Sequence, residues 1–405
     1  MNASLFATSI FVVLTLLNLA SPHDGMASAL FGYHPPPRLL AIGDLHGDIT
    51  NAKEILKFAQ IVDCEGKWIA GHDTVIQVGD VVDRGPHGHE IIDYFTTLKE
   101  DARQSGGEFI QLLGNHELMN MQGNMKFANA QTVTAFGGME SLKQAFDPIT
   151  GAYGTYLTKT CDAAVLRNRT LFVHAGVLPQ YAHLGVAELN RQVRNAILAK
   201  NISDPILLDD GPLWTRQIIY PAQKGNCSNL YESLKILSEY ETKHGRKPVD
   251  RMVIGHTIMQ DGAIHQFCDG KLIAIDIAIS QYMASGGRQG ILELRYDFAT
   301  HTDIVTPYIQ YPSQPFRQHA LPAVMFPKRI PVPPFEAKEK GGVQGAALTI
   351  RTYEDSMTKS ELVLLCIAFF FVAGLVASQR VKDGGKGLFS LSWLGGRRRK
   401  LEHAA

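Results

Sequence analysis

The sequence has no excess charge of either sign, because its 39 lysines and arginines balance its 39 aspartates and glutamates. A chain without net charge has no global field that attracts nucleic acid or an anionic membrane surface, so no nucleic-acid partner is expected. Lysine and arginine are also absent ahead of a hydrophobic run at residues 5–20, and no internal repeat is visible.

Cysteine is scarce, with five residues in a chain of 405. Cys366 lies in a C-terminal hydrophobic run, so four remain for the rest of the chain: Cys64, Cys161, Cys227 and Cys268. Four cysteines exclude more than two disulfide bonds, and an oxidising compartment would allow three different pairings. Four reduced and buried cysteines are an equally good interpretation for a domain of this size.

Two hydrophobic segments lie at the ends of the chain. Residues 5–20 have the length of a signal-peptide core, which predicts a cleaved leader at residues 1–27, with an uncleaved anchor as the alternative. Residues 362–377 form an unbroken apolar run, which predicts a transmembrane helix over residues 361–378. A buried core helix is the other interpretation of this run, but the basic residues that follow it argue against burial in the domain.

The basic tail at residues 379–405 sets the predicted topology. Flanks rich in lysine and arginine stay on the cytosolic side, so the body is expected in a lumen or outside the cell. The predicted location is a secretory-pathway membrane, at the endoplasmic reticulum or beyond, which the chain crosses once. A proline-rich spacer at residues 307–360 would separate the membrane helix from the body. Three glycosylation sequons agree with the predicted side: Asn168, Asn201 and Asn226.

Between residues 28 and 306 the sequence predicts a single α/β domain. Short apolar runs with the character of buried strands alternate with amphipathic helical patterns, such as those at residues 49–59 and 91–98. Repetition of strand, loop and helix predicts sheets that are covered by helices. The predicted strands are residues 39–42, 75–78, 109–113, 171–173, 252–254, 272–277 and 290–296.

Five short motifs follow the predicted strands. They are GDLHG from Gly43, GDVVDRG from Gly79, GNHE from Gly114, HAG from His174 and GH from Gly255. Each motif alone is a weak signal, since a lone aspartate after a strand usually caps a turn or a helix. Together they place carboxylate, amide and imidazole groups at strand ends, where the loops of a packed sheet converge. This set of ligands suits a pair of divalent first-row metal ions.

The motif series resembles the phosphoprotein-phosphatase branch of the calcineurin-like metallophosphoesterases, across roughly residues 39–280. Within that branch the chain is similar to the Shewanella-like protein phosphatases. Three features favour them over the mainstream serine/threonine phosphatases: Asp48 after GDLHG, Leu113 before GNHE, and residues 276–287 in place of an aromatic-containing loop. The resemblance implies a β-sandwich of two mixed sheets flanked by helices. It also implies hydrolysis of phosphomonoesters, with phosphorylated protein as the expected substrate.

The resemblance further implies two divalent metal ions, with manganese favoured and iron and zinc as alternatives. One ion would be held mainly by Asp44, His46, Asp80 and His256, and Asp80 would bridge to the second. The second ion would also take Asn115 and His174. The motifs define least clearly which of the two ions His256 contacts.

Four more residues receive roles from the resemblance. A hydroxide that bridges the metal ions would attack phosphorus, and His116 would protonate the leaving oxygen as general acid. Asp83 would bond the other ring nitrogen of His116 and fix its tautomer. Arg84 and Arg216 would bind phosphate oxygens. Asp276 also follows a predicted strand, but no motif includes it, and we interpret it as structural.

Other functions would use the same residues. A small-molecule phosphatase or a dinucleoside-polyphosphate hydrolase needs the same metal site, and the sequence does not separate these activities from a protein phosphatase. An inactive, membrane-anchored binding module is disfavoured, because all six ligands and His116 are present. The sequence indicates nothing about the oligomeric state.

Overall fold

The fold is built on two mixed β-sheets. The computed structural model describes residues 37–284, 286–297, 302–310 and 330–331. The six-stranded sheet runs in the order β11 (Ile330–Pro331), β10 (Thr302–Gln310), β9 (Gln289–Asp297), β1 (Leu39–Ile42), β2 (Thr74–Gln77) and β3 (Glu108–Gln111). The five-stranded sheet runs in the order β4 (Ala164–Arg167), β5 (Thr170–Val173), β6 (Arg251–Ile254), β8 (Leu272–Ala274) and β7 (His265–Phe267).

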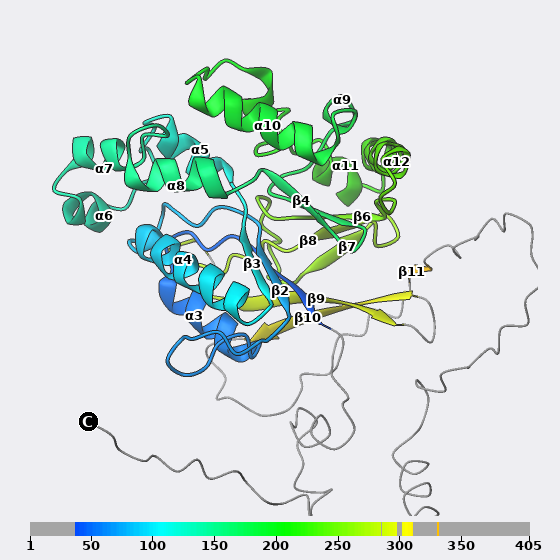
Figure 1. Ribbon diagram of the computed structural model, residues 1–405, viewed down its shortest axis with the longest axis horizontal. Coiled ribbons are helices and arrows are strands. Elements are labelled where there is room, and N and C mark those ends of the chain that lie inside the picture. The colour runs from blue at the N-terminus through cyan, green and yellow to red at the C-terminus, as the bar shows by residue number, and fades with distance from the viewer. Residues whose placement is uncertain (1–36, 285, 298–301, 311–329, 332–405) are drawn as a thin grey trace, which may run out of the picture. The chain divides into compact units, whose positions relative to one another are not determined.

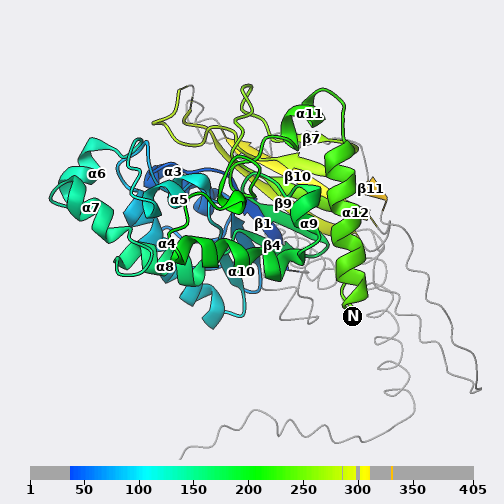
Figure 2. The ribbon, with the colours of Figure 1, turned by 90° about the horizontal axis from the view of Figure 1, so that it is seen from above.

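Helices fill the connections between the strands. They are α3 (Ile49–Phe58), α4 (Gly88–Gln104), α5 (Asn115–Met121), α6 (Ala130–Ala135), α7 (Met139–Ala145), α8 (Ala152–Thr160), α9 (Pro179–Ala182), α10 (Gly185–Leu198), η1 (Pro205–Leu207), α11 (Ile219–Gln223) and α12 (Ser228–Lys243). In Figure 1, α3 and α4 lie beside the six-stranded sheet, and α9, α10 and α12 lie beside the five-stranded sheet. Figures 1 and 2 both place α6 and α7 at one end of this arrangement and α12 at the other.

Each sheet contains three neighbouring parallel strands, which form one side of the six-stranded sheet and the centre of the five-stranded sheet. In the first sheet β1 pairs with β2 and β2 with β3, and in the second β5 pairs with β6 and β6 with β8, all in parallel. Parallel strands end at the same edge of their sheet, so the loops that follow them gather there. All five motifs lie in these loops, after β1, β2, β3, β5 and β6.

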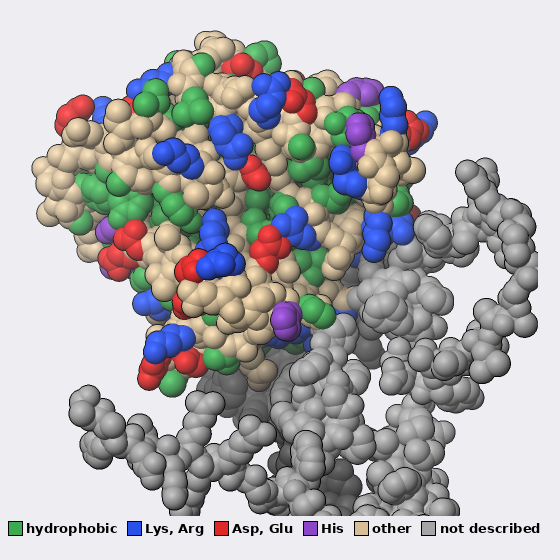
Figure 3. All heavy atoms as spheres, viewed as in Figure 1, with side chains coloured by type: hydrophobic (Ala, Val, Ile, Leu, Met, Phe, Trp, Pro, Cys, Tyr) green, Lys and Arg blue, Asp and Glu red, His purple; other side chains and the backbone are tan. Residues whose placement is uncertain are grey.

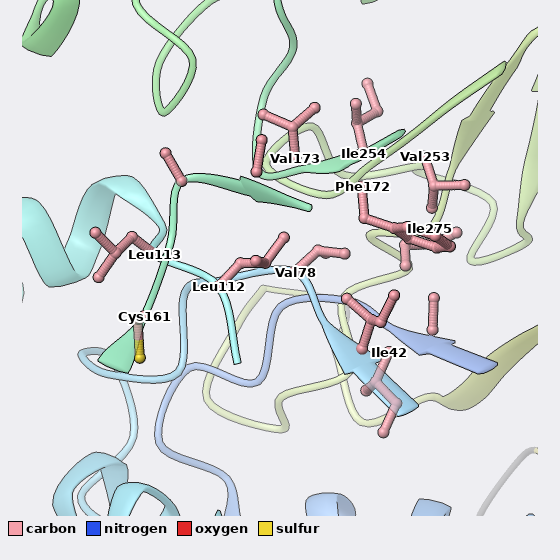
Figure 4. Packing of buried hydrophobic residues seen from close by; sticks show 14 of the residues in the cluster. Ile42, Val78, Leu112, Leu113, Cys161, Phe172, Val173, Val253, Ile254 and Ile275 are labelled. Atoms are coloured by element: carbon pink, nitrogen blue, oxygen red, sulfur yellow. The ribbon is translucent and has the colours of Figure 1, made fainter. Parts of the chain in front are cut away.

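One apolar core joins the two sheets directly beneath these loops. Figure 4 shows side chains from both sheets packed together. They include Ile42 from the first sheet and Val173 and Ile254 from the second, each at most 1% exposed. Each of these residues lies one or two positions before a predicted metal ligand. Burial of such a side chain contributes about 1.5–3 kcal/mol, so the core anchors the start of every ligand loop.

Two predicted boundaries differ from the structure. The strand predicted at residues 272–277 ends at Ala274, because the chain then turns towards the ligand loops and the backbone N–H of Ile275 bonds to the oxygen of Ile254 (2.9 Å). Strand β10 continues to Gln310, beyond the limit of the domain predicted at residue 306. Pro307 lies inside this strand opposite Leu292. A proline is tolerated there because β11 pairs with β10 only at Thr302 and Asp303, which leaves this part of β10 as an edge in the described residues.

The four cysteines outside the C-terminal run are of three kinds. Cys227, just before α12, forms a disulfide with Cys268 in the turn between β7 and β8. Cys161 is free and buried, and Cys64 is free and exposed. The described residues therefore contain one disulfide bond, where the sequence analysis considered two disulfides or four reduced cysteines.

The predicted leader, membrane helix and basic tail lie outside the described residues. Among those that are described, no helix is both long enough and apolar enough to span a bilayer. On the face shown in Figure 3, basic and acidic side chains are interspersed, as a chain with no net charge predicts.

Candidate active site

The structure brings the six predicted metal ligands together at the strand ends. All are buried, none more than 8% exposed: Asp44, His46, Asp80, Asn115, His174 and His256. Four of them, together with His116, form two groups that share Asp80. One group contains His46 and His116, and the other contains His174 and His256, with all ligand atoms in a group within 4.8 Å of one another.

Asp80 lies at the centre of this arrangement. Its Oδ2 is 3.7 Å from Nε2 of His46 and 3.4 Å from Nε2 of His174. Its Oδ1 accepts a hydrogen bond from the backbone N–H of His116 (2.9 Å), at the start of α5. One buried carboxylate thus faces imidazole nitrogens from both sheets.

Backbone carbonyls fix the histidine rings. Nδ1 of His46 lies 3.2 Å from the oxygen of Val82, and Nδ1 of His174 lies 2.9 Å from the oxygen of Val78. Nε2 of His256 lies 3.0 Å from the oxygen of Trp214. A carbonyl accepts only from an N–H, so in the neutral rings of His46 and His256 the other nitrogen carries a lone pair. Histidines that bind metal ions are oriented in this way.

The ring of His256 lies against that of His174, with ring centroids 4.9 Å apart, and both belong to one group with Asp80. Asp44 meets the backbone of His256, whose N–H donates to both carboxylate oxygens at 3.0 and 3.2 Å. The two rings adjoin because β5 and β6 are neighbours in one sheet, while Asp44 follows β1 in the other. The assignment of His256 mainly to the ion of Asp44 and His46 stays a prediction.

Glycines are required where these loops cross. A Cβ on Gly255 would lie 2.2 Å from Oδ1 of Asp44, and a Cβ on Gly114 would lie 2.2 Å from Oδ1 of Asp80. Any side chain at either position would displace a carboxylate. The glycines of the GH and GNHE motifs therefore allow the close approach of loops from different strands.

Burial and neighbouring charge set the protonation of the ligands. Burial lowers the pKa of His46 to about 4 and that of His256 to about 3, so both rings are neutral at pH 7. Burial raises the pKa of Asp80, but His174 and His116 outweigh it and hold the pKa well below its ordinary value. Ionised carboxylate and neutral imidazole are the protonation states that divalent cations require. Burial raises the pKa of Asp44. Burial lowers the pKa of His174, but the charge and hydrogen bond of Asp80 outweigh it and raise this pKa overall, so an ion would compete with protons at these two donors. By chemical type, the oxygen and nitrogen donors of the site fit the predicted ions.

His116 and Asp83 form the predicted pair. Nδ1 of His116 lies 2.7 Å from Oδ2 of Asp83, whose Oδ1 accepts from the side-chain amide of Asn120 (3.0 Å). Nε2 of His116 faces Asp80 at 3.9 Å. Burial lowers the pKa of His116, but Asp80 and Asp83 outweigh it, and the pKa is raised overall. These two carboxylates therefore favour the protonated form of the His116 ring.

The charges of the two predicted arginines act on different histidine groups. The charge of Arg84 lowers the pKa of His46, and the charge of Arg216 lowers the pKa of His256. Both side chains are half-buried. The guanidinium of Arg84 lies over the ring of Phe127, with Cζ 3.9 Å from the ring centroid.

Two acidic residues of the site were not assigned from the sequence. Glu117 accepts backbone N–H groups of Gly114, Asp80 and Val81 at 2.7–2.8 Å, so it fastens the GDVVDRG loop to α5. Glu117 is the last residue of the GNHE motif, and that position could have identified it as part of the site. Asp276, which we interpreted as structural, lies beside Asp44: burial raises the pKa of Asp44, and the charge of Asp276 raises it further. Its position after a strand matches that of the ligands.

Asp48 also has a structural explanation. It caps α3 by accepting from the backbone N–H of Asn51 (3.0 Å), and its Oδ2 accepts from the N–H of Gln281 (2.8 Å). The loop of residues 276–287 is thereby fixed to the GDLHG loop. Tyr282 in that loop is 42% exposed and packs on Gly85, so this loop does contain an aromatic side chain.

Comparison with known proteins agrees with the geometry. A family model described as calcineurin-like phosphoesterase matches residues 37–260, more than half of the chain. The chain is 28% identical to Shewanella-like protein phosphatase 2 of Arabidopsis thaliana, over 65% of this chain and 77% of that protein. It is 28% identical to Shewanella-like protein phosphatase 1 of Plasmodium berghei, over 62% and 69%.

A solved structure has the same fold. The cold-active protein-tyrosine phosphatase of a psychrophilic Shewanella superimposes with a TM-score of 0.54 at 23% sequence identity, over 68% of this chain and 80% of that one. The predicted fold of two mixed sheets is confirmed, and so is the resemblance to the Shewanella-like phosphatases. This chain belongs to the family of calcineurin-like phosphoesterases.

Proposed function

We propose that this protein is a phosphomonoesterase that uses two divalent metal ions and acts on phosphorylated proteins. The observation that carries the proposal is the position of Asp80. Its carboxylate faces nitrogens of His46, His116 and His174 at 3.4–3.9 Å and belongs to both histidine groups. A shared carboxylate is how two-metal sites keep their ions close enough to hold one phosphate.

The six ligands would divide between two ions through Asp80. Asp44 and His46 would hold one ion, and Asn115 and His174 would hold the other. The ring of His256 lies beside that of His174. Manganese is our first choice, with iron and zinc as alternatives, because nitrogen and oxygen donors suit all three. Such ions, when bound, neutralise phosphate oxygens and make a water molecule more acidic.

His116 would supply the proton that the leaving oxygen needs. Its Nδ1–H is held by Asp83, so the proton to be transferred is on Nε2, the nitrogen that faces the metal site. The raised pKa of His116 favours retention of that proton until the leaving oxygen needs it. Asn120 bonds the second oxygen of Asp83 and keeps the pair aligned.

Arg84 and Arg216 would bind the phosphate from two sides. Each carries a permanent positive charge near one histidine group, and a guanidinium can bond two phosphate oxygens at once. They would orient the ester and keep its negative charge balanced while the bond to the leaving oxygen breaks.

The names of the relatives support phosphorylated protein as the substrate. The membrane tether, with the body on the lumenal or extracellular side, is proposed on the sequence alone. Two structural facts are compatible with that side: all three sequon asparagines are exposed, and a disulfide is formed.

Turnover of full-length, manganese-loaded protein tests the activity. Hydrolysis of p-nitrophenyl phosphate is expected, together with turnover of phosphotyrosyl or phosphoseryl/threonyl peptides above that of diadenosine tetraphosphate. Absence of any phosphomonoester hydrolysis would contradict the enzyme assignment, and preference for the dinucleotide would contradict the substrate class. For topology, endoglycosidase should shift the mass of the expressed protein, and an unshifted chain with a cytosolic, protease-accessible body would reverse the orientation.

A further inference from the structure

Arg84 has an unusual environment for a side chain proposed to bind phosphate. No carboxylate forms an ion pair with it among the described residues, and its Nε is buried without a hydrogen-bond partner in that same part of the chain. An arginine that binds phosphate benefits from this, because a carboxylate partner would compete for its donors. Something else must therefore hold the guanidinium in place.

Phe127, in the connection between α5 and α6, contacts Arg84 in two ways. Its ring lies under the guanidinium, with Cζ of Arg84 3.9 Å from the centroid. Its backbone oxygen accepts from the N–H of Arg84 (3.0 Å). The ring is also 5.2 Å from that of His116. A single half-buried aromatic ring thus lies against both the proposed phosphate-binding arginine and the proposed acid.

The backbone at Arg84 also depends on this segment. Arg84 has φ of +65° and Asp83 has φ of +69°, a conformation that non-glycine residues adopt only when their surroundings hold them. Asn129 donates from its side-chain amide to the oxygen of Arg84 (2.8 Å), and Thr132 donates to the oxygen of Pro86 (2.8 Å). Residues 127–132 therefore hold both the backbone and the side chain of the DRGP sequence.

We propose that Phe127 is a positioning residue that holds the Arg84 guanidinium, by its ring face, in the orientation that binds phosphate. A flat aromatic face attracts a guanidinium without occupying its N–H groups, so all of them stay available to phosphate oxygens. This inference rests on the proposed function of the site and assigns the residue that orders it.

The test compares Phe127→Leu with Phe127→Tyr in the full-length, manganese-loaded protein. For the leucine variant, the KM for p-nitrophenyl phosphate and the inhibition constant of inorganic phosphate should both rise about tenfold, because the ring face is lost. The tyrosine variant keeps the ring face and should restore both constants. Metal content should equal that of the wild type in both variants.

Phe136→Leu is the matched control, since Phe136 is a half-buried aromatic that packs on His89, Phe146 and Tyr153 away from Arg84. It should lower the melting temperature and leave the phosphate inhibition constant unchanged. A second test places Phe127→Leu in an Arg84→Ala background, where it should cause no further loss of phosphate binding.

Three outcomes would overturn the proposal. They are an unchanged phosphate inhibition constant in Phe127→Leu, failure of tyrosine to restore it, and full additivity of the Phe127 and Arg84 changes. An inactive wild-type protein would instead contradict the proposed function, so the two failures are distinguishable.

Discussion

The two sheets contribute differently to the active site. The six-stranded sheet supplies the carboxylates Asp44 and Asp80, the acid pair His116 and Asp83, and Arg84, while the five-stranded sheet supplies the imidazoles of His174 and His256. The loops also differ in backbone conformation. His46, Asp80, Asp83 and Arg84 all have positive φ in the first sheet's loops, whereas only His256 does among the second sheet's ligands.

The two sheets therefore supply different chemical groups to the site. The first sheet contributes Asp44, Asp80 and the proposed acid pair, in loops that store backbone strain, and the second sheet contributes imidazole nitrogens and the buried acid Asp276. Asp80 is the carboxylate that belongs to both histidine groups in the described residues. The following changes test this difference between the sheets.

Asp80→Asn should have the largest effect, because it removes the group that both halves share. We expect kcat/KM for p-nitrophenyl phosphate to fall on the order of 10⁴-fold. Metal content, measured by elemental analysis, should fall by at least one ion per chain. If activity and metal content stay at wild-type levels, Asp80 is not the bridging ligand.

His116→Asn should stop proton donation while leaving metal binding intact. We expect kcat for phenyl phosphate to fall about 10³-fold, and kcat for p-nitrophenyl phosphate to fall less, because its leaving group needs no proton. Steady-state kinetics on both esters, with metal content as the control, measure this. An equal loss on both esters would show that His116 acts in some way other than as general acid.

Breaking the disulfide, which joins α12 to the five-stranded sheet, should lower the stability of the protein and leave kcat unchanged. Cys227 and Cys268 are 41 residues apart, and a bond that closes a loop of that length contributes about 4 kcal/mol to the free energy of unfolding. The Cys227→Ser/Cys268→Ser variant should lose stability of that order in chemical denaturation, with kcat unchanged at a temperature where it is folded. A large fall in kcat without loss of stability would refute this separation.

Asp276→Asn should change how the stability of the metal-free protein depends on pH. Burial raises the pKa of Asp276 to about 6, so the folded state binds a proton there more tightly than the unfolded chain does. That stabilisation is complete below about pH 4 and is lost as pH rises through about 6.

The asparagine variant cannot ionise at this position. It should therefore be more stable than the wild type at pH 7, by up to about 3 kcal/mol, and the difference should shrink as pH falls to 5. Denaturation of both metal-free proteins at pH 5, 6 and 7 measures it. A difference that does not change with pH would show that Asp276 does not titrate in this range.

Much of the active site could be located from sequence because each ligand follows an apolar strand. The runs that became β1, β2, β3, β5 and β6 differ from the predicted ranges by at most two residues at either end. These strands can be predicted from neighbouring residues alone, because a continuous apolar run ending in Gly-Asp or His predicts both a strand and a polar turn. The predicted family and fold are confirmed for the same reason.

What could not be predicted depends on contacts between distant segments. The position of His256 beside His174 follows from the pairing of β5 with β6 across about 80 residues of sequence. Asp276 was set aside because no motif contains it, although it lies against Asp44. The continuation of β10 past residue 306 depends on pairing with β9, which outweighs the proline signal.

The kinds of donor, their order and the strand that each follows could be read from the sequence, because hydrophobic runs and turn residues act locally. The fold added which donors lie in one group, which acid lies beside Asp44 and which ring lies against Arg84. Those relations depend on how two sheets pack over one core, and strand pairing across long stretches of chain leaves little trace in local pattern.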